Sequence, residues 1–513
     1  MRTFTEVDGR FPDYLTDESH LYTASEIEKI YFPETIPELQ EIVRLSRDED
    51  KQITISGGGT GIAAGRVPLQ DWIIATDEMR YIDDGVMWKD EESGIEYSYR
   101  LDVLDDENAV IVLPVAITVK SIQNLVRELG WFYPPDPTER SAFIGGNFAT
   151  NASGARSFKY GSTRDWIQGA RIVLPDGSPI TLDRSKLEEI GSNEKIVIGG
   201  YKVPRPHYGY PDTTKNVAGP VITNSSQAID LFVGTDGIFG ITGEISLRLI
   251  RPPMQILNII VYCKTEKAAI KLIEVAQEQR EEGTTPIPLS VEYLDERASK
   301  IMRNGEGEGV IVILEQDANT DEETDEFVEY WVNKFEELGI EETSVAMTPK
   351  EIEHHKFLRH LIPETVNSLA RSNNQPKLGT DYASPIRELE RIFRLSKEIG
   401  REFEEYLNHR RNLGESIGYA MWSHSGDSHV HLNLLPRDEE EKKYAKMLMV
   451  KMMKEIVSWN GTIAAEHGLG KKIFDGKPAL IIMIGSEGLE EIHRMKAILD
   501  PKFLLNRGNL ISY

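Results

Sequence analysis

The first half of the chain alternates short apolar segments with amphipathic ones. Between about residues 30 and 250, segments rich in β-branched residues, such as QITIS (52–56) and GEISLRLI (243–250), predict strands separated by glycine-rich turns. The segment TVKSIQNLVRELG (118–130) places apolar residues three and four positions apart, which is typical of a helix with one buried face. Residues 185–230 carry scattered prolines among polar residues, which favours a long surface excursion. This half therefore predicts an α/β or α+β domain.

A different pattern begins after Arg251-Pro252-Pro253. Strand, helix, strand, strand and helix patterns follow one another between residues 255 and 339. This order suggests an antiparallel sheet backed by two helices, as in a ferredoxin-like split βαβ unit. We therefore expect an α+β chain with a boundary near residue 252, which gives a first domain of residues 1–252 and a second of residues 253–490.

Composition narrows the choice of partner and compartment. The 513 residues include 58 Lys and Arg against 84 Asp and Glu, and this net charge of -26 argues against nucleic acid, whose phosphates need a surplus of cations. Cys263 is the only cysteine, which excludes an intrachain disulfide, an all-cysteine zinc site and an iron–sulfur cluster held by this chain alone. We expect a cytoplasmic protein, because the N-terminus has no signal-like pattern and no window approaches the ~20 apolar residues that cross a bilayer. Contact with the inner membrane face would then require a partner.

The strand predicted at residues 53–56 leads directly into Gly57-Gly58-Gly59-Thr60-Gly61. Glycine allows positive φ and lets backbone N–H groups approach an anion, so this loop could hold a phosphate; a flexible turn is the alternative. Residues 59–64 nearly satisfy the dinucleotide fingerprint G-x-G-x-x-A. That fingerprint requires a helix to start at its last glycine, and Gly65 and Pro68 would interrupt one. We therefore reject a Rossmann fold.

Three further segments combine glycine with short polar side chains, namely PPDPT (134–138), IGGNFATNASG (144–154) and YGSTRD (160–165). They offer backbone and side-chain donors to a planar ligand and a pyrophosphate. Together with the first glycine loop, LPDG (174–177), KNVAG (215–219) and GTDGIFGI (234–241), they resemble in order the FAD-binding fold of the vanillyl-alcohol oxidase and PCMH group. The chain is most similar to the branch that contains FAD-linked D-lactate dehydrogenase, the glycolate oxidase flavin subunit and D-2-hydroxyglutarate dehydrogenase.

This resemblance implies a PCMH-type FAD-binding domain followed by a ferredoxin-like substrate domain with a helical C-terminal part. FAD would be bound without a covalent link, because the first glycine loop has no His where some relatives carry one. Asp500-Pro501 and Asn506-Arg507-Gly508 resemble the closing element of the family, so residues 491–513 would return to the first domain as a tail. The implied cofactor-binding residues are Gly57, Gly58, Gly59, Thr60, Gly61, Gly145, Gly146, Asn151, Gly154, Gly161, Thr163 and Asn506.

Histidines gather in the second domain. His429 and His431 would share one face of a strand, and His424 could join them only if residues 425–427 turn the chain. Downstream, Glu466 and His467 stand side by side. Two imidazoles and one carboxylate with open coordination positions suit zinc or a similar divalent ion; partly exposed histidines in polar turns are the alternative.

The branch that the chain resembles carries G-H-x-G-D-G-N-x-H and E-H-G segments in this domain. By that resemblance, His424, His431 and Glu466 would bind a divalent metal, with zinc as the first choice and manganese or iron as alternatives. His467 would be the catalytic base. This chain has Ser428-His429 where relatives have Gly-Asn, so His429 either alters the surroundings of the metal or competes for it.

These groups suit the oxidation of a 2-hydroxy acid. A metal chelated by the substrate stabilises the alkoxide, a His with an ordinary pKa of about 6.5 accepts the hydroxyl proton, and the hydride passes to the flavin. Arg359 and Lys377 lie on segments that look like substrate-binding elements of the family and could bind the carboxylate; ordinary surface cations are the alternative. Asn433 matches a family position that hydrogen-bonds the substrate.

We therefore expect an FAD-dependent D-2-hydroxy-acid dehydrogenase for a substrate of the D-lactate, glycolate or 2-hydroxyglutarate class. Electrons would pass to an external acceptor such as a quinone, an electron-transfer flavoprotein or an iron–sulfur subunit, and a homodimer is compatible with the sequence. The main alternative is a non-catalytic flavin subunit that relays electrons in a larger complex, but a relay has no use for a metal and a base. An ether-lipid synthase of the same group would need an acyl tunnel, for which no extra apolar segment is evident.

Overall fold

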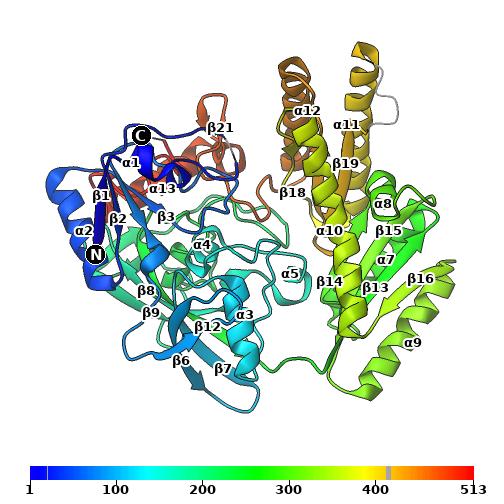
Figure 1. Cartoon of the computed structure of the whole chain (residues 1–513), viewed down its shortest axis with the longest axis horizontal. Helices are drawn as coiled ribbons and strands as arrows, with labels where there is room; N and C mark the ends of the chain where they lie inside the picture. Colours follow the sequence, from blue (N-terminus) through cyan, green and yellow to red (C-terminus); the bar gives the residue numbers. More distant parts are fainter. Residues whose placement is uncertain (20, 412–416, 513) are drawn as a thin grey trace.

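The computed structural model describes residues 1–19, 21–411 and 417–512, which form two sides of one molecule (Figure 1). The first 250 residues, coloured blue to green, form one side together with the red C-terminal end. The green to orange elements between them form the other side. Within the described ranges, no helix combines the length and apolar character needed to cross a membrane.

The first side is built on two sheets. The smaller sheet has the strand order β1-β2-β4-β3, in which β4 pairs in parallel with both β2 and β3. The larger sheet has six antiparallel strands in the order β5-β6-β7-β12-β8-β9, and buried residues alternate with less buried ones along β12, so one face enters the core. The strands are β1 (Arg2–Thr5), β2 (Lys29–Phe32), β3 (Ile53–Ser56), β4 (Trp72–Ala75), β5 (Val86–Lys89), β6 (Glu96–Val103), β7 (Asn108–Pro114), β8 (Ile167–Val173), β9 (Pro179–Asp183) and β12 (Ile241–Ile250).

Helices of the first side begin where side chains satisfy their free N–H groups. The Thr35 hydroxyl accepts a bond from the amide of Glu38, and Thr118 does the same for Ser121, which fixes the starts of α2 and α3. The helices are α1 (Val7–Arg10), α2 (Ile36–Glu49), α3 (Val119–Glu128), α4 (Ile144–Thr150), α5 (Ser157–Tyr160) and α6 (Thr163–Trp166).

Two segments contain secondary structure that the sequence patterns did not predict. The first part of the glycine-rich segment at residues 144–154 forms helix α4, which ends at Asn151 in a left-handed conformation with φ 50°. Within residues 185–230, β10 (Lys195–Ile198) and β11 (Tyr201–Pro204) form a hairpin. The K-I-V-I alternation directs Ile196 and Ile198 toward the core and leaves Val197 exposed on the opposite face.

The second side contains one larger sheet with the order β16-β13-β15-β14-β19-β20-β17, and β18 also pairs with β20. When β13 to β16 are numbered 1 to 4 along the chain, they lie side by side in the order 4-1-3-2. This is the order of a ferredoxin-like sheet, so the predicted unit is confirmed. The strands are β13 (Gln255–Cys263), β14 (Ser290–Leu294), β15 (Val310–Ala318), β16 (Glu342–Ala346), β17 (Leu378–Gly379), β18 (Tyr382–Ala383), β19 (Tyr419–His424) and β20 (His429–Leu434).

Helices cover both faces of this sheet. Val312 and Leu314 of β15 pack in the main core with α7 and α9, whereas Ile311 and Ile313 pack in a second cluster with α8 and α10. The remaining long helices, α11 and α12, rise together at one end of the sheet (Figure 1). The helices of the second side are α7 (Glu266–Glu282), α8 (Glu296–Met302), α9 (Asp321–Glu337), α10 (Pro349–Ser372), α11 (Leu389–Arg410) and α12 (Glu439–Ser458), whereas α13 (Ile481–Leu499) lies on the first side (Figure 1). A short hairpin, β21 (Ile473–Phe474) and β22 (Lys477–Pro478), precedes α13.

The two sides meet through charged groups around α5. Arg156 Nε lies 2.9 Å from Glu315 Oε2. Lys159 Nζ lies 2.6 Å from Asp317 Oδ1, and the Tyr160 hydroxyl donates to the same carboxylate. Both acids belong to β15, so this central strand of the second sheet is anchored to the first side.

The end of the chain returns to the first side. Leu505 forms a parallel bridge with Ile53, and the amide of Asn506 donates to the Ile53 carbonyl at 2.8 Å. The Lys471 ammonium donates to the Gly65 carbonyl and to Asn509. The first glycine loop is therefore braced by residues that follow it by more than 400 positions.

We predict that Lys496→Met destabilises the protein by about 3–5 kcal/mol, because a buried carboxylate would lose its cation. Lys496 of α13 is fully buried, and its ammonium bonds Asp500 Oδ2 at 2.7 Å and the carbonyls of Ile238 and Leu505. Urea denaturation would measure the effect. Lys502→Met is the matched control, since Lys502 pairs with Asp50 at the exposed surface, and equal midpoints for both variants would contradict the prediction.

Candidate active site

A β-hairpin gathers three imidazoles. His424 ends β19, residues Ser425–Asp427 form a 3-10 turn, and His429 begins β20, where it pairs with His424 across the hairpin. Ser428 completes the turn in a left-handed conformation. The His429 ring centroid lies 4.4 Å from that of His431 and 5.4 Å from that of His424. The turn on which the sequence prediction depended is therefore present.

Asp381 holds the Glu466 segment against this hairpin. Its carboxylate accepts bonds from the amides of Glu466 and His467, the second at 2.8 Å. Its carbonyl accepts from the amide of Ala465, so two groups of one residue fix the segment. This segment lies beside β18, because Ala383 and Thr462 exchange a pair of backbone hydrogen bonds.

The Glu466 carboxylate lies at the centre of the cluster. Its Oε1 is 3.4 Å from His431 Nε2, 3.6 Å from His424 Nε2 and 3.4 Å from His467 Nε2. Nitrogen and oxygen ligands at 2.0–2.2 Å from a tetrahedral zinc ion are about 3.3–3.5 Å apart, so these separations fit ligands that share one ion. Burial alone would raise the pKa of Glu466, but Lys215 and the neighbouring imidazoles hold it well below its usual range.

The far nitrogens of two histidines have the partners that metal ligands usually have. His424 Nδ1 lies 2.9 Å from Glu292 Oε1, and His431 Nδ1 lies 3.2 Å from the Thr380 carbonyl. A carboxylate or a carbonyl on Nδ1 orients the ring and leaves Nε2 free to bind an ion. The donor set of His424, His431 and Glu466 therefore fits a divalent metal.

His467 is the most accessible imidazole of the cluster. Its side chain is 31% exposed, whereas those of His424, His429 and His431 are 9% exposed or less. Its Nδ1 lies 3.5 Å from Asp381 Oδ1. Burial lowers the pKa of His467, but Asp381 and Glu466 more than offset this, so the net pKa is raised.

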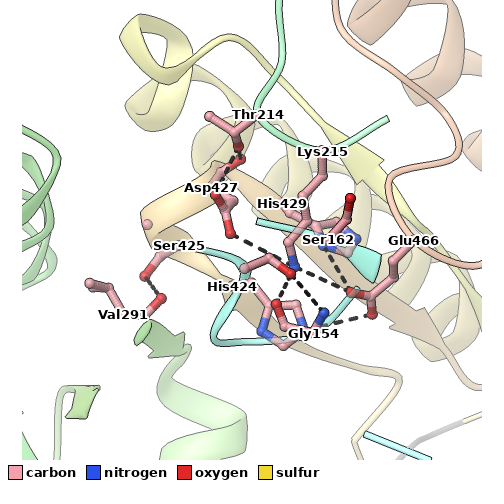
Figure 2. Close-up of polar contacts among 12 residues, drawn as sticks. Gly154, Ser162, Thr214, Lys215, Val291, His424, Ser425, Asp427, His429 and Glu466 are labelled. Atoms are coloured by element: carbon pink, nitrogen blue, oxygen red, sulfur yellow. Dashed lines mark hydrogen bonds and ion pairs between the residues drawn. The ribbon is translucent and has the colours of Figure 1, made fainter. Parts of the chain in front are cut away.

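Lys215 connects the cluster to the first side (Figure 2). Its buried ammonium donates to the Gly154 carbonyl at 2.7 Å and lies 3.3 Å from Glu466 Oε2 and 3.8 Å from Asp427 Oδ2. Asp427 also accepts a bond from the hydroxyl of Thr214. One cation thus joins a glycine-rich segment of the first side to two acids of the second.

The candidate substrate-binding residues occupy different surroundings. Arg359 of α10 pairs with Glu292, the acid that also holds His424, but its side chain remains 37% exposed. Lys377 lies with its ammonium 5.5 Å from the Trp422 ring centroid, and burial lowers its pKa to about 8. Asn433 of β20 donates from Nδ2 to the His431 carbonyl.

Several glycines of the predicted FAD site leave room for a ligand. A Cβ added at Gly57 or Gly146 would meet no atom within 4 Å. Gly59 leaves no such room, because it adopts φ +82° and packs against the Arg66 guanidinium, whose Nη1 donates to the Gly57 carbonyl. In addition, the buried hydroxyl of Ser153 has no hydrogen-bond partner among the described residues. These features fit a cofactor that approaches the main chain closely.

The other predicted cofactor residues are tied to protein partners or closely packed. Asn151 Oδ1 accepts from the amide of Arg164, the Thr163 hydroxyl donates to the Ala152 carbonyl, and the Asn506 amide group bonds Ile55 and Asp236. Gly145, Gly154 and Gly161 are each required by close packing, because an added Cβ would lie within 3 Å of Val115, Asp136 and Asp165, respectively. Gly58 approaches the Phe143 ring, and Thr60 and Gly61 lie at the partly open end of the loop.

Three acids and a lysine that organise the cluster were not predicted as site residues. Asp381 orients Glu466 and His467, Glu292 orients His424, and Asp427 and Lys215 complete the network. A signal existed for Glu292, which is a single acid in the apolar strand PLSVEYL. A charge at a fully buried strand position needs a partner, but the sequence does not identify that partner.

Comparisons with known proteins agree with this architecture. Residues 27–183 match the family described as FAD binding domain, and residues 262–510 match FAD linked oxidases, C-terminal domain. D-lactate dehydrogenase of Anaerostipes hadrus is 23% identical over 510 residues, covering 97% of this chain and 92% of that protein. Glycolate oxidase subunit GlcD of Bacillus subtilis is 24% identical, covering 94% of this chain and 88% of the relative. D-2-hydroxyglutarate dehydrogenase of Stutzerimonas stutzeri is 21% identical, with coverages of 94% and 90%.

A solved structure of alkyldihydroxyacetonephosphate synthase has a similar fold. The TM-score is 0.60 at 16% sequence identity, and the match covers 94% of this chain and 76% of the other. At this identity the likeness concerns the fold alone.

We predict that Gly146→Ala weakens FAD binding at least about tenfold, because the added methyl group would occupy space that the protein itself leaves open. The stability of the apoprotein should not fall, since alanine is favoured over glycine within a helix. Titration of deflavinated protein with FAD would measure the affinity. Gly9→Ala in α1 is the control, because its Cβ also meets no atom within 4 Å. Unchanged affinity in Gly146→Ala would contradict the prediction.

Proposed function

The chain belongs to the FAD-linked oxidases, and from this membership we propose that it oxidises a D-2-hydroxy acid to the 2-oxo acid. The proposed substrate belongs to the class of D-lactate, glycolate and 2-hydroxyglutarate, on which relatives of similar length are named to act. The observation that carries the proposal is the position of Glu466 Oε1 within 3.6 Å of three imidazole nitrogens. A redox relay would gain nothing from burying these groups together.

His424, His431 and Glu466 would hold a divalent metal, for which zinc is the first choice and manganese or iron the alternatives. When bound, such an ion would supply Lewis-acid polarisation of the substrate hydroxyl, and bound FAD would supply the hydride acceptor. Glu292 and the Thr380 carbonyl keep the two imidazoles in the tautomer with a free Nε2. The protein thereby maintains a preorganised set of ligands.

His467 would take the hydroxyl proton at Nε2. Its greater exposure allows a substrate to reach it, and Asp381 beside Nδ1 would stabilise the imidazolium that forms. Lys377 and the exposed part of Arg359 would attract the substrate carboxylate, and Asn433 would add a hydrogen bond. These contacts would place the α-carbon for transfer of its hydride.

Reoxidation of the flavin would require an external acceptor, because the only cysteine, Cys263, is buried and cannot ligate a cluster alone. A quinone, an electron-transfer flavoprotein or an iron–sulfur subunit could serve.

Anaerobic mixing of the FAD-loaded protein with a panel of D- and L-2-hydroxy acids would test the proposal through bleaching of the flavin absorbance. We expect one or more D-acids to bleach it, a chelator to prevent the bleaching, and His467→Ala to slow it about 10²–10⁴-fold through loss of the base. His409→Ala, at the exposed end of α11, is the control and should react as the wild type does. Bleaching by no acid of the panel, together with normal flavin reduction by an artificial donor, would favour the relay instead.

A pH dependence follows from Lys377. Because burial lowers the pKa of Lys377 to about 8, its ammonium is present below about pH 8 and is lost as the pH rises further. We expect the inhibition constant of a small dicarboxylate such as oxalate to rise about tenfold for each pH unit above 8. Lys377→Arg, which stays protonated, should remove this rise, and Lys377→Met should bind weakly at every pH. The same alkaline profile in wild type and Lys377→Arg would show that another group causes it.

A further inference from the structure

We propose that His429 is a third imidazole ligand of the metal, so that the site consists of three histidines and Glu466. This inference rests on the proposed function and specifies the ligand set of the same site. One ring nitrogen from each of His424, His429 and His431 and one carboxylate oxygen of Glu466 form a group whose atoms all lie within 4.8 Å of one another.

The hydrogen bonds of His429 leave one nitrogen available. Its Nε2 lies 2.9 Å from Asp381 Oδ1, whereas its Nδ1 is buried and has no hydrogen-bond partner among the described residues. Glu466 Oε2 lies 3.8 Å from this Nδ1. An imidazole that donates from Nε2 to a carboxylate carries its free lone pair on Nδ1, which is the form that binds a metal.

The three histidines share one arrangement. His424 and His431 place Nδ1 on an oxygen acceptor and point Nε2 at Glu466, and His429 places Nε2 on an acceptor and points Nδ1 at the same carboxylate. A buried nitrogen without a partner costs about 1–3 kcal/mol, and a metal held jointly with Glu466 would remove this cost. His429 is fully buried, so water from the surface does not replace that partner.

Lys215 is compatible with such an ion. Its ammonium lies 3.3 Å from Glu466 Oε2, the oxygen that also faces His429. It keeps two further partners, the Gly154 carbonyl at 2.7 Å and Asp427 Oδ2 at 3.8 Å. Lys215 therefore remains satisfied when Glu466 turns toward a metal.

A third imidazole changes which metal the site should prefer. Nitrogen-rich sets favour zinc and its neighbours late in the first transition row, whereas manganese prefers carboxylate and water ligands. A site of three histidines and one carboxylate should therefore prefer zinc over manganese more strongly than a site of two histidines and one carboxylate.

X-ray absorption at the zinc edge, which counts imidazole ligands, tests the inference on the FAD- and zinc-loaded protein. We expect one imidazole fewer in His429→Asn than in the wild type, and at least a tenfold weaker zinc affinity in competition with a chromophoric chelator. Asn retains an amide that can bond Asp381, so the variant separates ligation from positioning. His355→Asn is the control, because His355 is a buried histidine held by Asn258 and Ser344 outside the cluster.

A second variant keeps the test independent of whether His429→Asn folds. His467→Asn removes the remaining imidazole of the cluster while His429 stays, and we expect three imidazoles on zinc. Two imidazoles in that variant, or an unchanged count in His429→Asn, would overturn the inference while leaving turnover of hydroxy acids intact in the wild type. Wild-type protein that binds no zinc and bleaches with no acid would instead refute the proposed function itself.

Discussion

Negative charge buried between the two halves of the chain is the constraint on which the site depends. Glu292, Asp381, Asp427 and Glu466 are all buried within one network, and an unpaired carboxylate in such a place would cost several kcal/mol. Each of them has a cationic or imidazole neighbour: Arg359 for Glu292, His429 for Asp381, Arg280 and Lys215 for Asp427, and Lys215 for Glu466. Together the acids outnumber the permanent cations, which is the electrostatic setting that favours a divalent ion.

The fold produces this network through the edge of the ferredoxin-like sheet. Adding β19 and β20 beside β14 brings the histidine hairpin next to Glu292, and β18 places Asp381 on the other side of β20. The sheet is covered by helices on both faces, so these polar residues lie in an interior that is otherwise apolar. Geometry in such an interior is fixed closely, since each side chain has few alternative partners.

Periodicity and motif order predicted the parts of the molecule in which local sequence decides the outcome. The strand and helix order after residue 255 follows from apolar spacing, and His424, His431 and Glu466 stand in short segments with a recognisable pattern. The role of Asp381 could not be predicted, because it contacts Glu466 only after β18 pairs with β20. The pairing of Arg359 with Glu292 was missed for the same reason, since 67 residues separate them and only the packing of α10 brings them together.

Lys215 connects the contact between the two halves of the chain to the candidate active site. On the proposed function, the hydride donor must lie within a few ångströms of the flavin, and an error of about 1 Å there can cost 10²-fold in rate. The Gly154 carbonyl belongs to a segment expected to approach the flavin, whereas Glu466 belongs to the candidate metal site, and one buried ammonium contacts both. Arg156 and Lys159 also pair with acids at this junction, but their partners, Glu315 and Asp317 of β15, lie outside the cluster. Lys215 therefore links the segment expected to hold the cofactor to the charge balance of Glu466, and on the proposed function a looser junction would disturb the cofactor position and the metal site together.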